Sequence, residues 1–229
     1  MHEKRIVPAL GLHWLTPLYD VVVRFATRER AFKRALLKQL EAQLGESPGD
    51  VLDLGCGTGT LAIEIARTRP DAAVTGIDAD PRMLAKAAEK RRRARVEVTF
   101  TEAMAQSLPH DDESFDSVVS TLVFHHLAGR DKPLVLAEIM RVMRPDGLLH
   151  VADWARPANP LMHAMFFFVR LFDGFENTRD NFRDRLPALF SEAGFVDVAA
   201  TRQFNTIAGT LALYRARKPG PRQQSSRRP

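Results

Sequence analysis

The sequence predicts an α/β fold in which helices cover both faces of a doubly wound, mainly parallel sheet. The first observation is an apolar run, Val51–Leu54, that leads into alternating glycines and then into a helical pattern from Leu61. The second is another apolar run, Val74–Asp78, which ends in an acid about 20 residues beyond the glycines, as a strand–helix–strand unit requires. The third is the alternation of strand and helix patterns up to Val151.

The glycine loop after the first predicted strand marks a ligand-binding corner. Gly55, Gly57 and Gly59 allow a tight turn and let the backbone approach a ligand with no Cβ in the way. A dinucleotide fingerprint has its third glycine where this chain has Thr60. Asp53 would repel a pyrophosphate at close range, whereas it suits a cationic, amine-bearing ligand. The loop therefore argues against a nicotinamide dehydrogenase, which remains a distant alternative.

The following segments continue the pattern in order. Thr101–Met104 places an acid after the third predicted strand, and Ser107–Pro109 follows it. Ser114–Thr121 is an acid-bearing apolar strand that leads into Leu122–Leu127, where two histidines are adjacent. Glu138–Val151 has the pattern of a helix, a turn and a fifth strand.

Over roughly residues 50–155, these elements together resemble the class I S-adenosylmethionine-dependent methyltransferases. The branch most similar in appearance contains the ubiquinone and menaquinone C-methyltransferases, whose N-terminal tyrosine–aspartate pair is matched by Tyr19 and Asp20. The resemblance implies a Rossmann-like, seven-stranded sheet with strand seven antiparallel. It also implies an N-terminal helical segment, a helical insertion after strand five, S-adenosyl-L-methionine as cofactor and S-adenosyl-L-homocysteine as product.

The resemblance further implies a set of cofactor contacts. Asp53 and the glycine loop hold the methionine end, and Asp78 accepts hydrogen bonds from the two ribose hydroxyls, which a carboxylate does with good geometry. Met83 lies against the adenine face, Glu102 accepts from the adenine amino group, and Tyr19 closes over the cofactor. The expected cofactor-binding residues are Tyr19, Asp53, Gly55, Cys56, Gly57, Gly59, Asp78, Ala79, Met83, Glu102, Ala103, Met104 and Ser120.

Two adjacent histidines are the candidates for catalysis. His125 and His126 follow strand four, at the carboxyl edge where doubly wound folds bind ligands, and either could accept a proton near neutral pH. The alternative is that the pair makes a structural hydrogen bond. A methyl donor that is already activated needs a general base only where the acceptor carries a proton.

Aromatic residues are expected to surround the acceptor. Trp14, Phe124, His125, Phe166 and Phe167 form the predicted substrate-binding set. The alternative is that the phenylalanines pack their helix onto the sheet. Three consecutive phenylalanines cannot all face one side of a helix, so at least one points away from the core.

Composition argues against several classes of function. The chain carries a net charge of +5, but residues 215–229 hold six basic residues and no acid, and the remainder has 27 basic against 28 acidic residues. No nucleic-acid partner is therefore expected. Cys56 is the single cysteine, which excludes an intrachain disulfide and a cysteine-cluster metal site, and no metal is expected.

The predicted organisation is one domain over residues 1–214, with a helical cap at 1–48 and a helical, substrate-side insertion at 154–184. The basic segment 215–229 is expected to be a disordered tail. Met1–Gly11 lacks the apolar stretch of a signal peptide, and Leu161–Phe172 is too short to span a bilayer. A cytoplasmic location follows, with a homodimer and peripheral membrane contact left open.

The predicted function is transfer of a methyl group from S-adenosylmethionine to an apolar small molecule that is quinone-, phenol-, lipid- or thiol-like. One alternative is an RNA or protein methyltransferase, which the nearly neutral core disfavours. The absence of an Asn-Pro-Pro-aromatic element after strand four, where Ser120–Val123 stands, also disfavours it. The other alternative is a cofactor-binding scaffold without catalytic activity.

Overall fold

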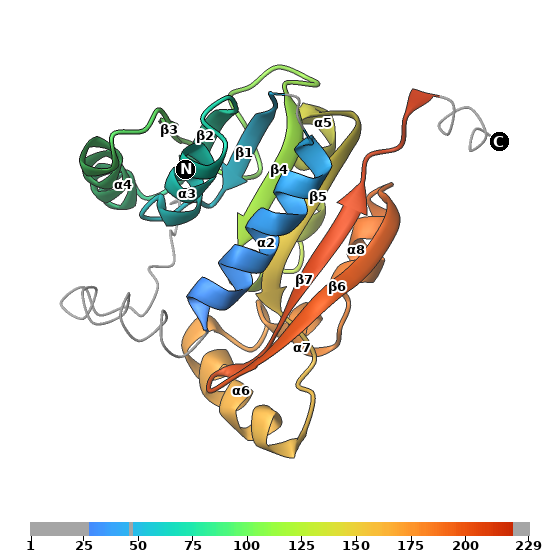
Figure 1. Ribbon diagram of the computed structural model, residues 1–229. Coiled ribbons are helices and arrows are strands. Elements are labelled where there is room, and N and C mark those ends of the chain that lie inside the picture. Colours follow the sequence, from blue (N-terminus) through green and yellow to red (C-terminus); the bar gives the residue numbers. More distant parts are fainter. Residues whose placement is uncertain (1–27, 46–47, 222–229) are drawn as a thin grey trace, which may run out of the picture.

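The computed structural model describes residues 28–45 and 48–221, which form a seven-stranded sheet in the order β3-β2-β1-β4-β5-β7-β6 (Figure 1). Strand β7 runs antiparallel to both of its neighbours, and the other pairings are parallel. The predicted fold class is therefore confirmed. The strands are β1 (Asp50–Leu54), β2 (Ala73–Asp78), β3 (Thr99–Glu102), β4 (Phe115–Thr121), β5 (Met143–Trp154), β6 (Val196–Thr206) and β7 (Gly209–Arg217).

Helices cover both faces of the sheet because the central strands are apolar on both sides. Along β1, Val51 joins one buried cluster with residues of α2 and α3, while Leu52 and Leu54 join the other with residues of α5 and α8. Figure 1 shows α2 in front of the sheet and α5 and α8 behind it. The helices are α2 (Glu29–Leu44), α3 (Thr60–Thr68), α4 (Pro81–Ala94), the 3-10 turn η2 (Phe124–His126), α5 (Lys132–Val142), α6 (Pro160–Asp173), α7 (Arg179–Phe182) and α8 (Leu186–Glu192).

The C-terminal boundary differs from the expected one. Strand β7 continues to Arg217, beyond the predicted end of the domain at residue 214. Lys218 is buried, and its ammonium donates a 2.6 Å hydrogen bond to the Met143 carbonyl. The basic composition of this segment was misleading because Arg215 and Arg217 alternate with the buried Tyr214 and Ala216 along a strand, which puts the charges on its more accessible side.

Other expectations fall outside or partly outside the described residues. Most of the predicted N-terminal cap precedes residue 28, and within the described part it consists of α2. The insertion after strand five is present as α6 and α7. No helix in residues 28–45 and 48–221 is both long and apolar enough to cross a bilayer.

Candidate functional site

A pocket of about 390 Å³ lies where β1, β2 and β4 end, the edge at which doubly wound sheets bind ligands. The glycine loop, the loops after β2, β3 and β4, and the first turns of α2 form its walls. Nine of the predicted site residues line it: Gly55, Cys56, Gly57, Asp78, Ala79, Met83, Ala103, Met104 and His126.

The three loop glycines are required for different reasons. All have positive φ, and a Cβ on Gly55 would lie 2.3 Å from a methyl group of Val123. A Cβ on Gly59 would lie 2.8 Å from the Cβ of Ala87, so Gly59 serves the packing of α3 on α4 and does not line the pocket. Gly57 lines the pocket and has open space in front of it, which leaves room for a ligand to approach the backbone.

Asp78 ends β2 and joins it to the glycine loop. Its Oδ2 accepts a 2.8 Å hydrogen bond from the Gly57 N–H, and its Oδ1 accepts one of 2.9 Å from the Asp80 N–H. These two bonds fix the orientation of the carboxylate at the wall of the pocket. Each oxygen keeps a further lone pair that can accept from a ligand hydroxyl.

Asp53 is fully buried beneath the loop and does not line the pocket. Its Oδ2 accepts a 3.1 Å hydrogen bond from the Ala62 N–H, while Oδ1 has no hydrogen-bond partner among the described residues. Burial raises the pKa of Asp53 to about 7, although the ammonium of Lys33 opposes that rise. A cation bound above the loop would therefore favour the ionised carboxylate of Asp53 electrostatically, without direct contact.

Two other predicted cofactor contacts lie outside the pocket. Glu102 is exposed and lines none of the wall, whereas its neighbours Ala103 and Met104 do. Ser120 is buried, and its hydroxyl donates a 3.0 Å hydrogen bond to the Leu54 carbonyl, which ties β4 to β1. Ser120 points away from the pocket while its neighbour Thr121 lines it, as expected where side chains on a strand alternate between faces.

The two histidines have different environments. His125 is buried, and its Nδ1 lies 2.8 Å from Oδ1 of Asp153, which matches the structural alternative. His126 lines the pocket, with its ring centroid 3.9 Å from that of His125. Crowding by protein atoms around the cavity, and then His125, lowers the pKa of His126 to about 3. The His126 side chain is exposed on its other side, and its imidazole is neutral near pH 7.

Asp153 is the organising residue that the sequence prediction missed. Besides His125, it accepts hydrogen bonds from the Phe124 N–H at 2.8 Å, the Trp154 N–H at 2.7 Å and the Asn181 amide at 3.0 Å. Burial alone would raise the pKa of Asp153, but the charge and hydrogen bonds of its partners outweigh burial and lower it. One carboxylate thus joins β5, the histidine loop and α7. The available signal was an acid directly after the apolar pair Val151 and Ala152, near the end of β5.

The predicted substrate-binding phenylalanines do not line the pocket. Phe124 is fully buried and packs edge-on against Phe190. Phe166 is also fully buried between Trp154 and Phe182. The exposed fraction of Phe167 is 51%, and Phe167 lies outside the pocket, as the helical period required of at least one of the three phenylalanines. Trp14 and Tyr19 lie outside the described residues.

Residues that are distant in the sequence from the glycine loop complete the walls of the pocket. Glu29, Phe32 and Lys33 bring the start of α2 to the glycine loop, a contact that no local pattern could reveal. Leu122, Val123 and Leu127 form an apolar wall beside His126. These three lie in the segment that follows strand four, so their position along the chain was a usable signal.

The sequence matches the family described as "Methyltransferase domain" over residues 51–147. It is 31% identical over 233 residues to the demethylmenaquinone methyltransferase of Lactobacillus johnsonii, covering 90% of this chain and 93% of that protein. It is 34% identical over 154 residues to the demethylmenaquinone methyltransferase of Deinococcus radiodurans, of which the alignment covers 62%. The fold is similar to that of the magnesium protoporphyrin IX methyltransferase from Synechocystis with bound S-adenosylhomocysteine, with a TM-score of 0.67, 19% identity and 83% of each chain covered.

Proposed function

This chain belongs to the class I S-adenosylmethionine-dependent methyltransferases, in the branch of the ubiquinone and menaquinone C-methyltransferases, and we propose that it methylates an apolar small molecule. The observation that carries this proposal is the apolar wall of Leu122, Val123 and Leu127 beside the cofactor corner. The activities for which its relatives are named support it, since demethylmenaquinone is a quinone. A quinone-, phenol-, lipid- or thiol-like acceptor suits this wall.

The cofactor would be held by residues that fit its chemistry. Asp78 offers a fixed carboxylate to the ribose hydroxyls, and Met83, Ala103 and Met104 offer apolar contact to the adenine. Asp53, with its unpartnered buried oxygen, would favour the cationic methionine end through its field. When bound, S-adenosylmethionine supplies an activated methyl group.

The chain's own contribution is positioning and exclusion of water. Leu122, Val123 and Leu127 would hold the acceptor in a water-poor site, where a correct line of approach accounts for much of the rate. His126 is neutral near pH 7 and would accept a hydrogen bond from an acceptor hydroxyl. Asp153, acting through His125 and the Phe124 N–H, would hold the histidine loop in place.

The decisive experiment is isothermal titration of the full chain with S-adenosylmethionine, S-adenosylhomocysteine and NADH. We expect micromolar binding of both adenosyl ligands and none of NADH. Failure of both adenosyl ligands to bind would remove the proposal.

A binding-competent protein would next be given labelled S-adenosylmethionine with quinone, phenol, lipid and thiol acceptors. We expect methyl transfer to at least one of these classes. Transfer to RNA or protein instead, or binding with no transfer to any acceptor, would support one of the two alternatives.

A further inference from the structure

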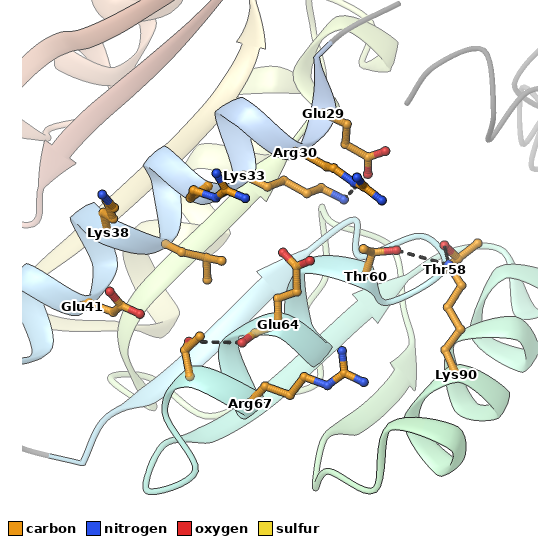
Figure 2. Close-up of a pocket in the computed structure, with 13 residues that line it drawn as sticks. Glu29, Arg30, Lys33, Lys38, Glu41, Thr58, Thr60, Glu64, Arg67 and Lys90 are labelled. Carbon is orange, nitrogen blue, oxygen red and sulfur yellow. Dashed lines mark hydrogen bonds and ion pairs between the residues drawn. The ribbon is translucent and has the colours of Figure 1, made fainter. Parts of the chain in front are cut away.

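A second concave surface, which methyl transfer leaves unused, lies between α2 and α3 beside the cofactor pocket (Figure 2). This surface, the α2–α3 groove, has a volume of about 770 Å³. Glu29, Lys33, Thr58 and Thr60 line both the groove and the cofactor pocket. The two sites are therefore contiguous, so a ligand in one can influence the other.

The groove concentrates positive charge. Residues 28–45 and 48–221 contain 27 lysines and arginines against 25 aspartates and glutamates, an excess of two. The groove by itself has an excess of three, and a concave site of one sign focuses the field on an incoming ion of the other sign. Its charged residues are Arg30, Lys33, Arg34, Lys38, Arg67 and Lys90 against Glu29, Glu41 and Glu64.

The basic side chains of the groove differ in the hydrogen bonds and ion pairs that they form. Lys33 pairs with Glu29, and the Lys90 ammonium donates to the hydroxyls of Thr58 and Thr60. The side chains of Arg30 and of Arg67, which lies near the other end of α3, form no hydrogen bond or ion pair with any residue in 28–45 or 48–221.

The positions of these groups favour one anion that several side chains bind together. Figure 2 shows Arg30 on α2 and Lys90 on α4 near the two threonines, with Glu64 and then Arg67 further along α3. Arg30 and Lys90 thus approach the threonines of the glycine loop from two helices, and Asp78, which lines only the cofactor pocket, is not part of this end of the groove.

We propose that this end of the α2–α3 groove binds a phosphate-bearing small molecule. The planar guanidinium group of Arg30 matches the paired oxygens of a phosphate, and the Lys90 ammonium and threonine hydroxyls add single donors. The three acids in the groove make a long polyanion such as RNA a poorer occupant than a compact anion. The site is separate from the acceptor wall formed by Leu122, Val123 and Leu127.

An anion bound in the groove should change the affinity of the neighbouring pocket for a charged cofactor. The groove carries three more cations than anions and is contiguous with the cofactor pocket, so its field disfavours a cation in that pocket. A diphosphate in the groove offsets that charge. Because S-adenosylmethionine carries a sulfonium charge that S-adenosylhomocysteine lacks, diphosphate should raise the affinity for the former relative to the latter by about twofold.

The test is isothermal titration of the full chain with sodium diphosphate in a low-salt buffer. We expect saturable, salt-sensitive binding that falls by about fivefold or more in Arg30→Glu and in Lys90→Glu. The matched control is Arg92→Glu, an equal charge change at an exposed residue of α4 outside the groove, which should leave the affinity unchanged. S-adenosylhomocysteine titrations of the same variants report on the cofactor pocket independently.

Four outcomes would overturn the proposal. These are no diphosphate binding, an equal loss of affinity in Arg92→Glu, equal affinity for citrate, and tighter binding of a short single-stranded RNA. Citrate tests whether phosphate chemistry or net charge alone is recognised. The RNA arm separates a compact ligand from a polymeric one. None of these outcomes depends on whether a methyl acceptor has been found.

Discussion

At the scale of single residues, Asp53 combines full burial with an ionisable group whose pKa is raised to about 7. A cationic cofactor above the loop favours the ionised form of Asp53 and therefore lowers the pKa of Asp53. Binding of the cofactor then releases a proton. The affinity for S-adenosylmethionine should therefore rise with pH, by up to about tenfold between pH 6 and pH 8.

The Asp53→Asn variant should show little of this rise, because its amide does not titrate. Titrations at several pH values, in buffers of different ionisation enthalpy, measure both the slope and the released proton. The same slope in the wild-type chain and the variant would assign the effect to another group.

Asp78 is predicted to carry part of the cofactor affinity. Asp78→Ala removes an acceptor for the ribose hydroxyls and also frees the N–H groups of Gly57 and Asp80. Binding of S-adenosylhomocysteine should weaken by on the order of 1–3 kcal/mol in calorimetry. Asp71→Ala, at an exposed residue outside the pocket, is the control, and unchanged affinity in Asp78→Ala would mean that the ribose binds elsewhere.

Asp153 is predicted to stabilise the acceptor side of the fold. Asp153→Asn puts an amide NH₂ against N–H donors, whichever way the amide is turned. Urea unfolding should show a loss on the order of 3–5 kcal/mol. Asp184→Asn, at an exposed carboxylate 3.4 Å from the Tyr214 hydroxyl, should cost less than about 1 kcal/mol. Similar losses in the two variants would contradict the special role of Asp153.

At the scale of elements, α6 attaches to the sheet through one side and presents another to solvent. Phe166 is fully buried against Trp154 and Phe182, whereas half of the Phe167 side chain is exposed. Phe166→Ala should lower the free energy of unfolding by about 3–5 kcal/mol, because it leaves a cavity in the core. Phe167→Ala is the adjacent control and should cost less than about 1 kcal/mol. Equal effects in urea unfolding would mean that α6 is turned differently.

At the scale of the whole molecule, the sheet is completed by β7, which lies between β5 and β6. A chain that ends at Tyr214 loses the end of β7 and the hydrogen bond from Lys218 to Met143. Compared with a chain that ends at Pro221, it should be less stable by on the order of 3 kcal/mol. Thermal unfolding followed by circular dichroism measures the difference, and equal melting temperatures would restore the boundary predicted from composition.

The order of strands and helices along the chain and the glycine-loop corner could be predicted because their signals are local. A strand, three glycines and an acid one strand–helix unit later lie within 30 residues of one another, and the geometry of that unit brings them together. Gly55, Gly57 and Asp78 accordingly line the pocket, as expected from the sequence alone. The exposed Phe167 followed from the helical period, although the period could not say which of the three phenylalanines would be exposed.

The acceptor side depended on contacts that no local pattern encodes. Phe124 and Phe166 are as apolar as a substrate wall would be, yet they fill the core because Phe190, Trp154 and Phe182 meet them there.

The sequence by itself therefore determined the fold class, the family and the cofactor corner, since residues close along the chain set these. The tertiary structure decided how Asp153 holds His125, how α2 reaches the pocket and how the basic α2–α3 groove forms. These features arise where side chains from separate elements converge, and their directions depend on the packing of the whole sheet.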